Sequence, residues 1–139
     1  KPLKSTSLMS FKEIAVGDHS FQGKEKPIRL KDLIENPLIS LGQGSTTYEF
    51  YSKFFLENDL VLSPDTEVET IDQVLPLIMN GLGIGFLPEL FVRPVIKEGK
   101  VCQIPLKENI PEREICLVEN HTFPPSIAAD MFKKMLVLK

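Results

Sequence analysis

Apolar side chains recur at helical spacing in two central segments of the chain, and each segment opens with a helix-start signal. The first signal is Thr46-Thr47-Tyr48-Glu49, a capping-box pattern in which Thr46 accepts from the first amides and Glu49 reaches back. The second signal is Thr70-Ile71-Asp72-Gln73, which has the same pattern. The two signals predict helices that begin at Thr46 and at Thr70.

The second of these helices is expected to end at a glycine turn. Gly81 stands at the position where a left-handed residue commonly ends a helix. Pro76 lies within the helix and should bend it. Gly83 and Gly85 would allow close backbone packing in a short buried strand that Pro88 stops.

Short apolar runs bounded by turn residues predict the strands and complete the fold class. Strands are expected over Phe11–Gly17, Leu38–Leu41, Gly83–Pro88, Val101–Pro105 and Glu114–Val118, with an extended segment over 60–70. Further helical turns are expected over Ile28–Ile34, after Pro88, and from Pro124 to the end of the chain. Strands alternating with helices in this way indicate an α/β fold, with helices covering a mixed sheet.

Composition narrows the classes of function. The 139 residues carry a formal charge of −3, which disfavours a nucleic-acid surface within this chain. No apolar run approaches the ~20 residues of a membrane helix, and the first residues lack the apolar stretch of a signal peptide, so we expect a cytoplasmic protein. The two cysteines, Cys102 and Cys116, stand in apolar, strand-like runs, which predicts buried, reduced thiols.

Two polar corners are the candidate ligand contacts. Gly44-Ser45-Thr46 lies where a strand passes into a helix, and Glu69-Thr70 occupies the equivalent place before the next helix. Amides at a helix start lack helical partners, and the helix dipole favours an anion there. Plain helix caps are the alternative interpretation. If both corners open onto one cleft, they form a binding site.

Other motifs in the chain do not reach the pattern of a known site. The glycines of 42–45 lack the lysine of a phosphate-binding loop, and those of 81–85 follow a helix, which reverses the dinucleotide-binding order. His19 and His121 stand far apart, and no cluster has metal-ligand spacing, so neither a metal nor a cofactor is expected. An enzyme that uses Cys116 or Glu69 is one hypothesis for the function, but we assign no catalytic residue.

Five short motifs, taken in order, resemble a known family. They are Leu30-Lys31-Asp32-Leu33, Pro37-Leu38-Ile39, Gly44-Ser45-Thr46, Glu69-Thr70-Ile71 and the segment Gly81–Pro88. Their order and spacing are similar to those of the C-terminal effector-binding domain of LysR-type transcriptional regulators. The similarity runs from about Phe11 to the end of the chain.

The resemblance implies a type II periplasmic-binding-protein-like fold, in which a small effector binds between two α/β lobes. Residues 1–16 would then be the end of the first lobe and a crossover strand, 17–118 the second lobe, and 119–139 the return crossover with a helix that packs on the first lobe. The family's DNA-binding helix-turn-helix would lie outside this chain. Partners for the strand around Ile14 and for the helix from Ser126 would be missing.

The resemblance also implies site residues, position by position. The helix start that faces the effector falls on Ser45, Thr46 and Thr47, the second corner on Glu69, Thr70 and Ile71, and the crossover strand near Gly17 and Asp18. The family dimerises through a helix and a following strand of this lobe. That interface would fall on Tyr48, Tyr51, Phe55, Val61 and Val68. The alternative interpretation is that the aromatic face of this helix, Tyr48, Tyr51, Phe54 and Phe55, is part of the core.

The expected function is therefore that of a sensing module. A polar or anionic small molecule would bind between the lobes and bias a DNA-binding homodimer or homotetramer, with no membrane partner. The alternative is a lobe of an extracytoplasmic solute-binding protein of a transporter, which would share the fold.

Overall fold

The computed structural model describes residues 2–137 and divides the chain into two compact units. Unit 1 contains the two ends of the chain, residues 1–11 and 112–139, and unit 2 contains residues 12–111. These boundaries lie five to seven residues before those expected from the sequence. The assignment of the segments to lobes stays a prediction, and it includes residues 1, 138 and 139, which lie outside the described part.

Unit 2 is built on a mixed sheet. Strand β2 (Glu13–Asp18) pairs antiparallel with β5 (Gly85–Pro88) on one side and with β6 (Val101–Ile104) on the other. Strands β3 (Ile39–Leu41) and β4 (Thr66–Val68) form a parallel pair. A parallel bridge between Leu38 and Ile84 joins this pair to β5, so the strands follow the order β4-β3-β5-β2-β6. The predicted α/β class with a mixed sheet is confirmed.

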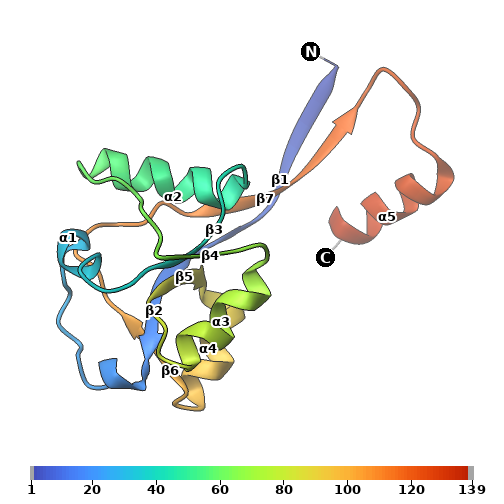
Figure 1. Ribbon diagram of the computed structural model, residues 1–139. Helices are drawn as coiled ribbons and strands as arrows, with labels where there is room; N and C mark the ends of the chain where they lie inside the picture. Colours follow the sequence, from blue (N-terminus) through green and yellow to red (C-terminus); the bar gives the residue numbers. More distant parts are fainter. Residues whose placement is uncertain (1, 138–139) are drawn as a thin grey trace. The chain divides into compact units, whose positions relative to one another are not determined.

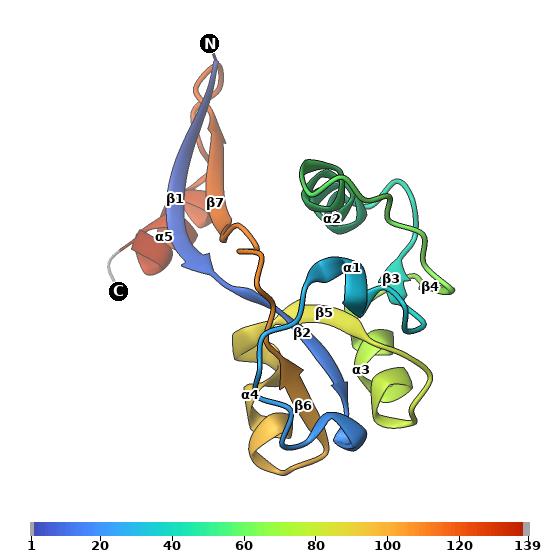
Figure 2. The same ribbon diagram turned by 90° about the vertical axis from the view of Figure 1, so that its left-hand side faces the viewer.

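Helices cover both faces of this sheet and enclose two separate apolar clusters (Figures 1 and 2). On one face, α1 (Leu30–Leu33) and α2 (Thr46–Glu57) pack on Ala15, Leu38 and Ile84. On the other face, α3 (Ile71–Met79) and α4 (Glu89–Lys97) pack on Ile14, Val16, Ile39 and Leu87. Neighbouring strand residues such as Ile14 and Ala15 fall in opposite clusters, because successive side chains of a strand point to opposite faces.

Local signals explain where α3 begins and ends. The side chain of Gln73 accepts hydrogen bonds from the amides of Thr70 and Glu69, at 3.1 and 2.9 Å, as the capping-box prediction requires. Gly81 has φ of +74°, and its amide donates to Ile78 O at 2.9 Å. The predicted capping box and glycine stop are both confirmed.

Unit 1 consists of a two-stranded ribbon and one helix. β1 (Leu3–Phe11) pairs antiparallel with β7 (Arg113–Asn120), with an irregularity in register between Ser7 and Met9. Helix α5 (Ile127–Val137) follows and buries none of its side chains. The apolar side chains exposed in this unit are Leu3, Met9, Ile115, Val118, Phe123, Ile127, Met131, Phe132, Met135 and Val137. Unit 1 therefore has no apolar core of its own among the described residues, whereas unit 2 has two clusters.

In the N-terminal region, one expected strand is confirmed with different bounds, and one expectation is wrong. The strand predicted over 11–17 is the end of β1 followed, after Lys12, by β2. The strand around Ile14 was expected to lack partners, but β2 is hydrogen-bonded on both edges. Because β5 and β6 both come from unit 2, this strand is part of that unit.

Within residues 2–137, no helix combines the length and the apolar character that a membrane crossing demands.

Replacing Gly83 with alanine should destabilise unit 2. This residue has φ of +156°, and a Cβ there would lie 2.6 Å from the carbonyl oxygen of Pro37. We expect Gly83→Ala to lower the free energy of unfolding by about 1–3 kcal/mol in urea denaturation. Gly42→Ala is the matched control, because a Cβ at Gly42 meets no atom within 4 Å and its φ is not positive. Equal stability of the two variants would contradict the role of Gly83.

Candidate functional site

The parallel pairing of β3 and β4 brings the two predicted corners to the same side of the sheet, the edge formed by the carboxyl ends of these two strands. Ile39 lies beside Thr66 and Leu41 beside Val68, and the amide of Gly42 donates to Val68 O at 3.2 Å. Both strands therefore end at the same edge. From there the chain enters α2 after β3 and α3 after β4, so both helix starts lie at this edge of the sheet, on opposite faces.

The first corner is capped one residue earlier than expected. The Ser45 hydroxyl accepts from the amide of Tyr48 at 3.0 Å and lies 3.0 Å from Gly42 O, to which it can donate. Ser45 has the extended backbone of a cap residue, and Thr46 is already the first residue of α2. The capping box predicted for Thr46 and Glu49 is therefore wrong. This leaves the exposed Thr46 hydroxyl without a hydrogen-bond partner among the described residues.

The other residues of the two corners differ in exposure. Thr47 is half-buried beside the cap, whereas Glu69 and Thr70 are exposed. The side chain of Ile71 is half-buried and packs against the cluster beneath α3. The corners thus present exposed hydroxyl groups, Thr46 and Thr70, next to helix-start amides. A polar or anionic group could accept hydrogen bonds there.

Gly17 and Asp18 lie at the opposite edge of the sheet. β2 runs antiparallel to β5, with Glu13 beside Pro88 and Val16 beside Gly85. Since β5 runs parallel to β3, the end of β2 lies beside the beginnings of β3 and β5, away from Ser45 and Thr70. The structure therefore does not bring Gly17 and Asp18 together with the two corners. Gly17 has a packing role, because a Cβ there would lie 2.5 Å from the Phe21 ring.

Sequence reasoning missed the residue of β2 that does share the edge of the corners. Glu13 begins β2 and is only 5% exposed, the one charged residue in the buried set described. Next to it, the carbonyl of Lys12 accepts from the amide of Glu89 at 2.8 Å, which fixes the start of α4 at this edge. A charged residue directly before the apolar run Ile14-Ala15-Val16 was the available signal.

Two of the five predicted interface residues are core residues. Tyr51 and Phe55 are buried, and the ring of Tyr51 stacks on Phe86 with 4.7 Å between centroids. Their side chains present no surface, so the aromatic content of α2 serves the core rather than an interface. Tyr48 and Val68 are half-buried and Val61 is exposed, and the interface prediction is left with these three.

The two cysteines are free, as predicted, but they are not both buried. Cys116 is exposed on β7, opposite Ser7 of β1, so its predicted burial is wrong. Cys102 is half-buried, and burial together with the charge of Asp18 raises the pKa of its thiol. Cys102 is therefore protonated near neutral pH, which makes it a poor nucleophile. Within residues 2–137, no three His, Cys, Asp or Glu side chains gather as a metal site would require.

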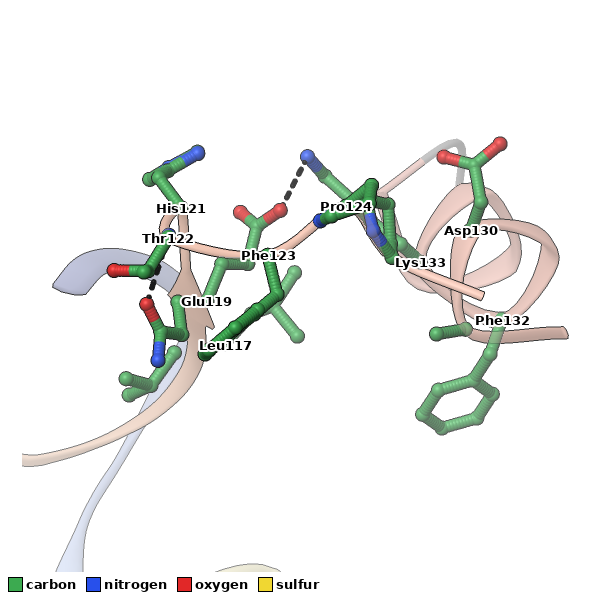
Figure 3. Close-up of a pocket in the computed structure, with 13 residues that line it drawn as sticks. Leu117, Glu119, His121, Thr122, Phe123, Pro124, Asp130, Phe132 and Lys133 are labelled. Carbon is green, nitrogen blue, oxygen red and sulfur yellow. Dashed lines mark hydrogen bonds and ion pairs between the residues drawn. The ribbon is translucent and has the colours of Figure 1, made fainter. Parts of the chain in front are cut away.

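A hollow of about 700 Å³ lies within unit 1, between the end of β7, the loop over 121–125 and α5 (Figure 3). None of the predicted site residues lines it. Much of its lining is apolar, including Leu117, Phe123 and Phe132. Lys133 reaches from α5 to Glu119 on β7 and forms an ion pair at 2.8 Å (Figure 3). Because the hollow is continuous with exposed apolar side chains of α5, it has the character of an uncovered packing face.

Comparison with known proteins defines the class. The chain matches the family model for the LysR substrate binding domain over residues 3–137, and it belongs to that family. It is 29% identical over 100 residues to the uncharacterized HTH-type transcriptional regulator YwqM of Bacillus subtilis (strain 168), covering 72% of this chain and 33% of that protein. It is 36% identical over 64 residues to the HTH-type transcriptional activator CmpR of Synechocystis sp., covering 46% of this chain and 21% of that protein.

Solved structures support the fold. The effector-binding domain of QuiR in complex with shikimate superposes with a TM-score of 0.82 at 18% identity, covering 99% of this chain and 65% of that one. The regulatory domain of Synechocystis PCC6803 CcmR in complex with 2-PG gives a TM-score of 0.85 at 14% identity, covering 98% and 66%. The predicted periplasmic-binding-protein-like fold is confirmed. This chain spans about a third of YwqM and about two thirds of these two domains.

Ser45→Ala should cost more stability than Thr46→Ala. The first change removes the acceptor for the Tyr48 amide, a loss of about 1 kcal/mol in free energy of unfolding. The second change affects an exposed residue in the first turn of α2 and should be close to neutral. Urea denaturation of both variants measures the difference. A larger loss of stability in Thr46→Ala than in Ser45→Ala would indicate that Thr46 is the N-cap after all.

The contact of α5 with β7 should weaken in acid. The hydrogen bond from Lys133, more than its charge, lowers the pKa of Glu119. A carboxylate with a lowered folded-state pKa contributes stability above its unfolded pKa of about 4.3, and this stability is lost as the pH falls through the lowered value. We expect hydrogen exchange of α5 amides, corrected for intrinsic rates, to accelerate below that pH.

Two lysine variants test the cause of this pH dependence. Lys133→Met should remove most of it. Lys134→Met is the matched control, because Lys134 pairs with Asp130 inside the helix, at 3.2 Å. An equal response of the two variants would show that the Glu119 pair is not responsible.

Proposed function

We propose that this chain is part of the effector-sensing region of a LysR-type transcriptional regulator, with unit 2 forming one wall of the effector cleft. The observation that carries the proposal is that the helix starts at Ser45 and Thr70 lie at the same edge of the sheet, which follows from the parallel β3–β4 register. The curated relatives are transcriptional regulators, which favours this role over that of a transporter's solute-binding protein.

The chemistry of this edge favours a polar or anionic effector. Two helix starts place amides and positive dipole ends at the same edge of the sheet, and the Thr46 and Thr70 hydroxyls lie at those starts. Shikimate, the compound in the QuiR complex, is a carboxylate. We infer a compound of that class for this regulator, acting in the cytoplasm, where its binding shifts the population of lobe arrangements.

Unit 1 would then be part of the first lobe. The uncovered apolar side chains of β7 and α5, with Ile127 83% exposed, fit a surface that packs on the remainder of a first lobe. In the whole regulator this arrangement would link the effector to a DNA-binding homodimer or homotetramer. Tyr48, Val61 and Val68 are the interface candidates that remain on unit 2.

The corner hydroxyls can be tested in the full-length regulator. Calorimetric titration with shikimate and related small carboxylates should identify a ligand. Thr46→Val and Thr70→Val should then each weaken its binding roughly 10- to 100-fold, the cost of one lost hydrogen bond to a charged group. Thr66→Val is the matched control, because Thr66 begins β4 at the opposite edge. Unchanged affinity in both corner variants would overturn the proposed site.

A further inference from the structure

A second hollow, of about 450 Å³, lies within unit 2 at the edge of the sheet opposite Ser45 and Thr70. It is formed where β2 ends and η1 (His19–Phe21) begins, together with the loop before α1 and the turns that lead into β3 and β5. All of these segments belong to unit 2. The hollow is therefore separate from the proposed effector corners.

One side of this hollow carries a carboxylate. Asp18 Oδ1 accepts from both the amide and the hydroxyl of Ser20, and this bonding with Ser20 lowers the pKa of Asp18. The other oxygen, Oδ2, makes no hydrogen bond to any of the described residues. It lies 3.1 Å from the place where a Cβ on Gly81 would stand. Asp18 is thus ionised at neutral pH and has one acceptor oxygen available.

Two lysines supply the opposite charge. Lys24 Nζ lies 5.3 Å from the centre of the Phe21 ring, and neither Lys24 nor Lys26 forms an ion pair with the described residues. Both line the hollow with Asp18, and the rest of the wall is partly apolar, including Ile28 and Ile104. The lining of the hollow thus combines two ammonium groups and one carboxylate with apolar side chains.

We propose that this hollow is a binding site for a free α-amino acid, with its carboxylate held by Lys24 and Lys26 and its ammonium group held by Asp18. A simple dianion fits less well, because it would meet the Asp18 charge. The volume lies within the range of small-molecule pockets. This site is distinct from the proposed effector cleft, because it lies at the opposite edge of the sheet. All of its lining residues belong to unit 2.

The test is a nitrogen-15 NMR titration of the whole chain with L-serine, L-glutamate and L-leucine as probes. At least one probe should give saturable shifts of the Gly81 and Gly83 amides and of residues 18–26, with Kd in the range of about 1–10 mM. Acetate and ethanolamine, each with one of the two charges, should bind roughly 10-fold more weakly or not at all. No saturable shift with any amino acid, or acetate binding as well as the best amino acid, would overturn the proposal.

Variants complete the test. Asp18→Asn retains an acceptor for Ser20, so the turn should persist, and both it and Lys26→Gln should weaken binding roughly 10-fold. Lys53→Gln, on the exposed face of α2, is the matched control and should leave the Kd unchanged. Unchanged affinity in Asp18→Asn would overturn the proposal. Thr46→Val and Thr70→Val should have no effect here, so this proposal and that of the effector corners can fail separately.

Discussion

Two main-chain hydrogen bonds at Ile84 connect the two parts of the sheet in unit 2. The amide of Ile39 donates to Ile84 O, and the amide of Ile84 donates to Pro37 O, each at 2.8 Å. Through them the parallel pair β3–β4 becomes continuous with β5, β2 and β6. The positions of both proposed sites depend on this junction, because it fixes the direction of β3 relative to β2. That direction decides which residues share an edge.

The same junction accounts for the arrangement of the core. Once the strands are in register, alternate residues go to the cluster under α1 and α2 or to the cluster under α3 and α4. Phe55 and Leu87, both with no exposed surface, illustrate the two sides. Each cluster is closed within unit 2. Unit 1, by contrast, is a two-stranded ribbon with one helix, which is too little to bury its own apolar side chains.

The sequence predicted the elements whose signals are local. The start of α3, its end at Gly81 and the strand that follows can each be recognised within a few residues, and each was confirmed. The N-cap of α2 was predicted at Thr46 instead of Ser45 because Ser45, Thr46 and Thr47 are adjacent hydroxyl residues, and only the backbone geometry distinguishes the cap. β1 was missed because Lys4-Ser5-Thr6-Ser7 has no apolar alternation, and its extended form depends on pairing with β7.

The site was only partly predictable for a related reason. Two helices that directly follow neighbouring parallel strands must begin at the same edge of the sheet. Ser45 and Thr70 could therefore be placed at one edge once β3 and β4 were assumed to pair in parallel. The position of Asp18 depends on the antiparallel pairing of β2 with β5, which is a long-range property without a local signature. The burial of Tyr51 and Phe55 likewise follows from contact with Phe86, which no helical spacing reveals.

The register of the ribbon in unit 1 has a topological consequence. Phe11 lies beside Arg113, so the chain leaves β1 and returns to β7 at adjacent points. Residues 12–111 are therefore an insertion whose two ends are held one strand spacing apart, roughly 5 Å. Closely spaced ends are the geometric condition for inserting or removing a segment without a change in the path of the host chain. This segment carries one wall of the proposed effector cleft and the whole of the second hollow.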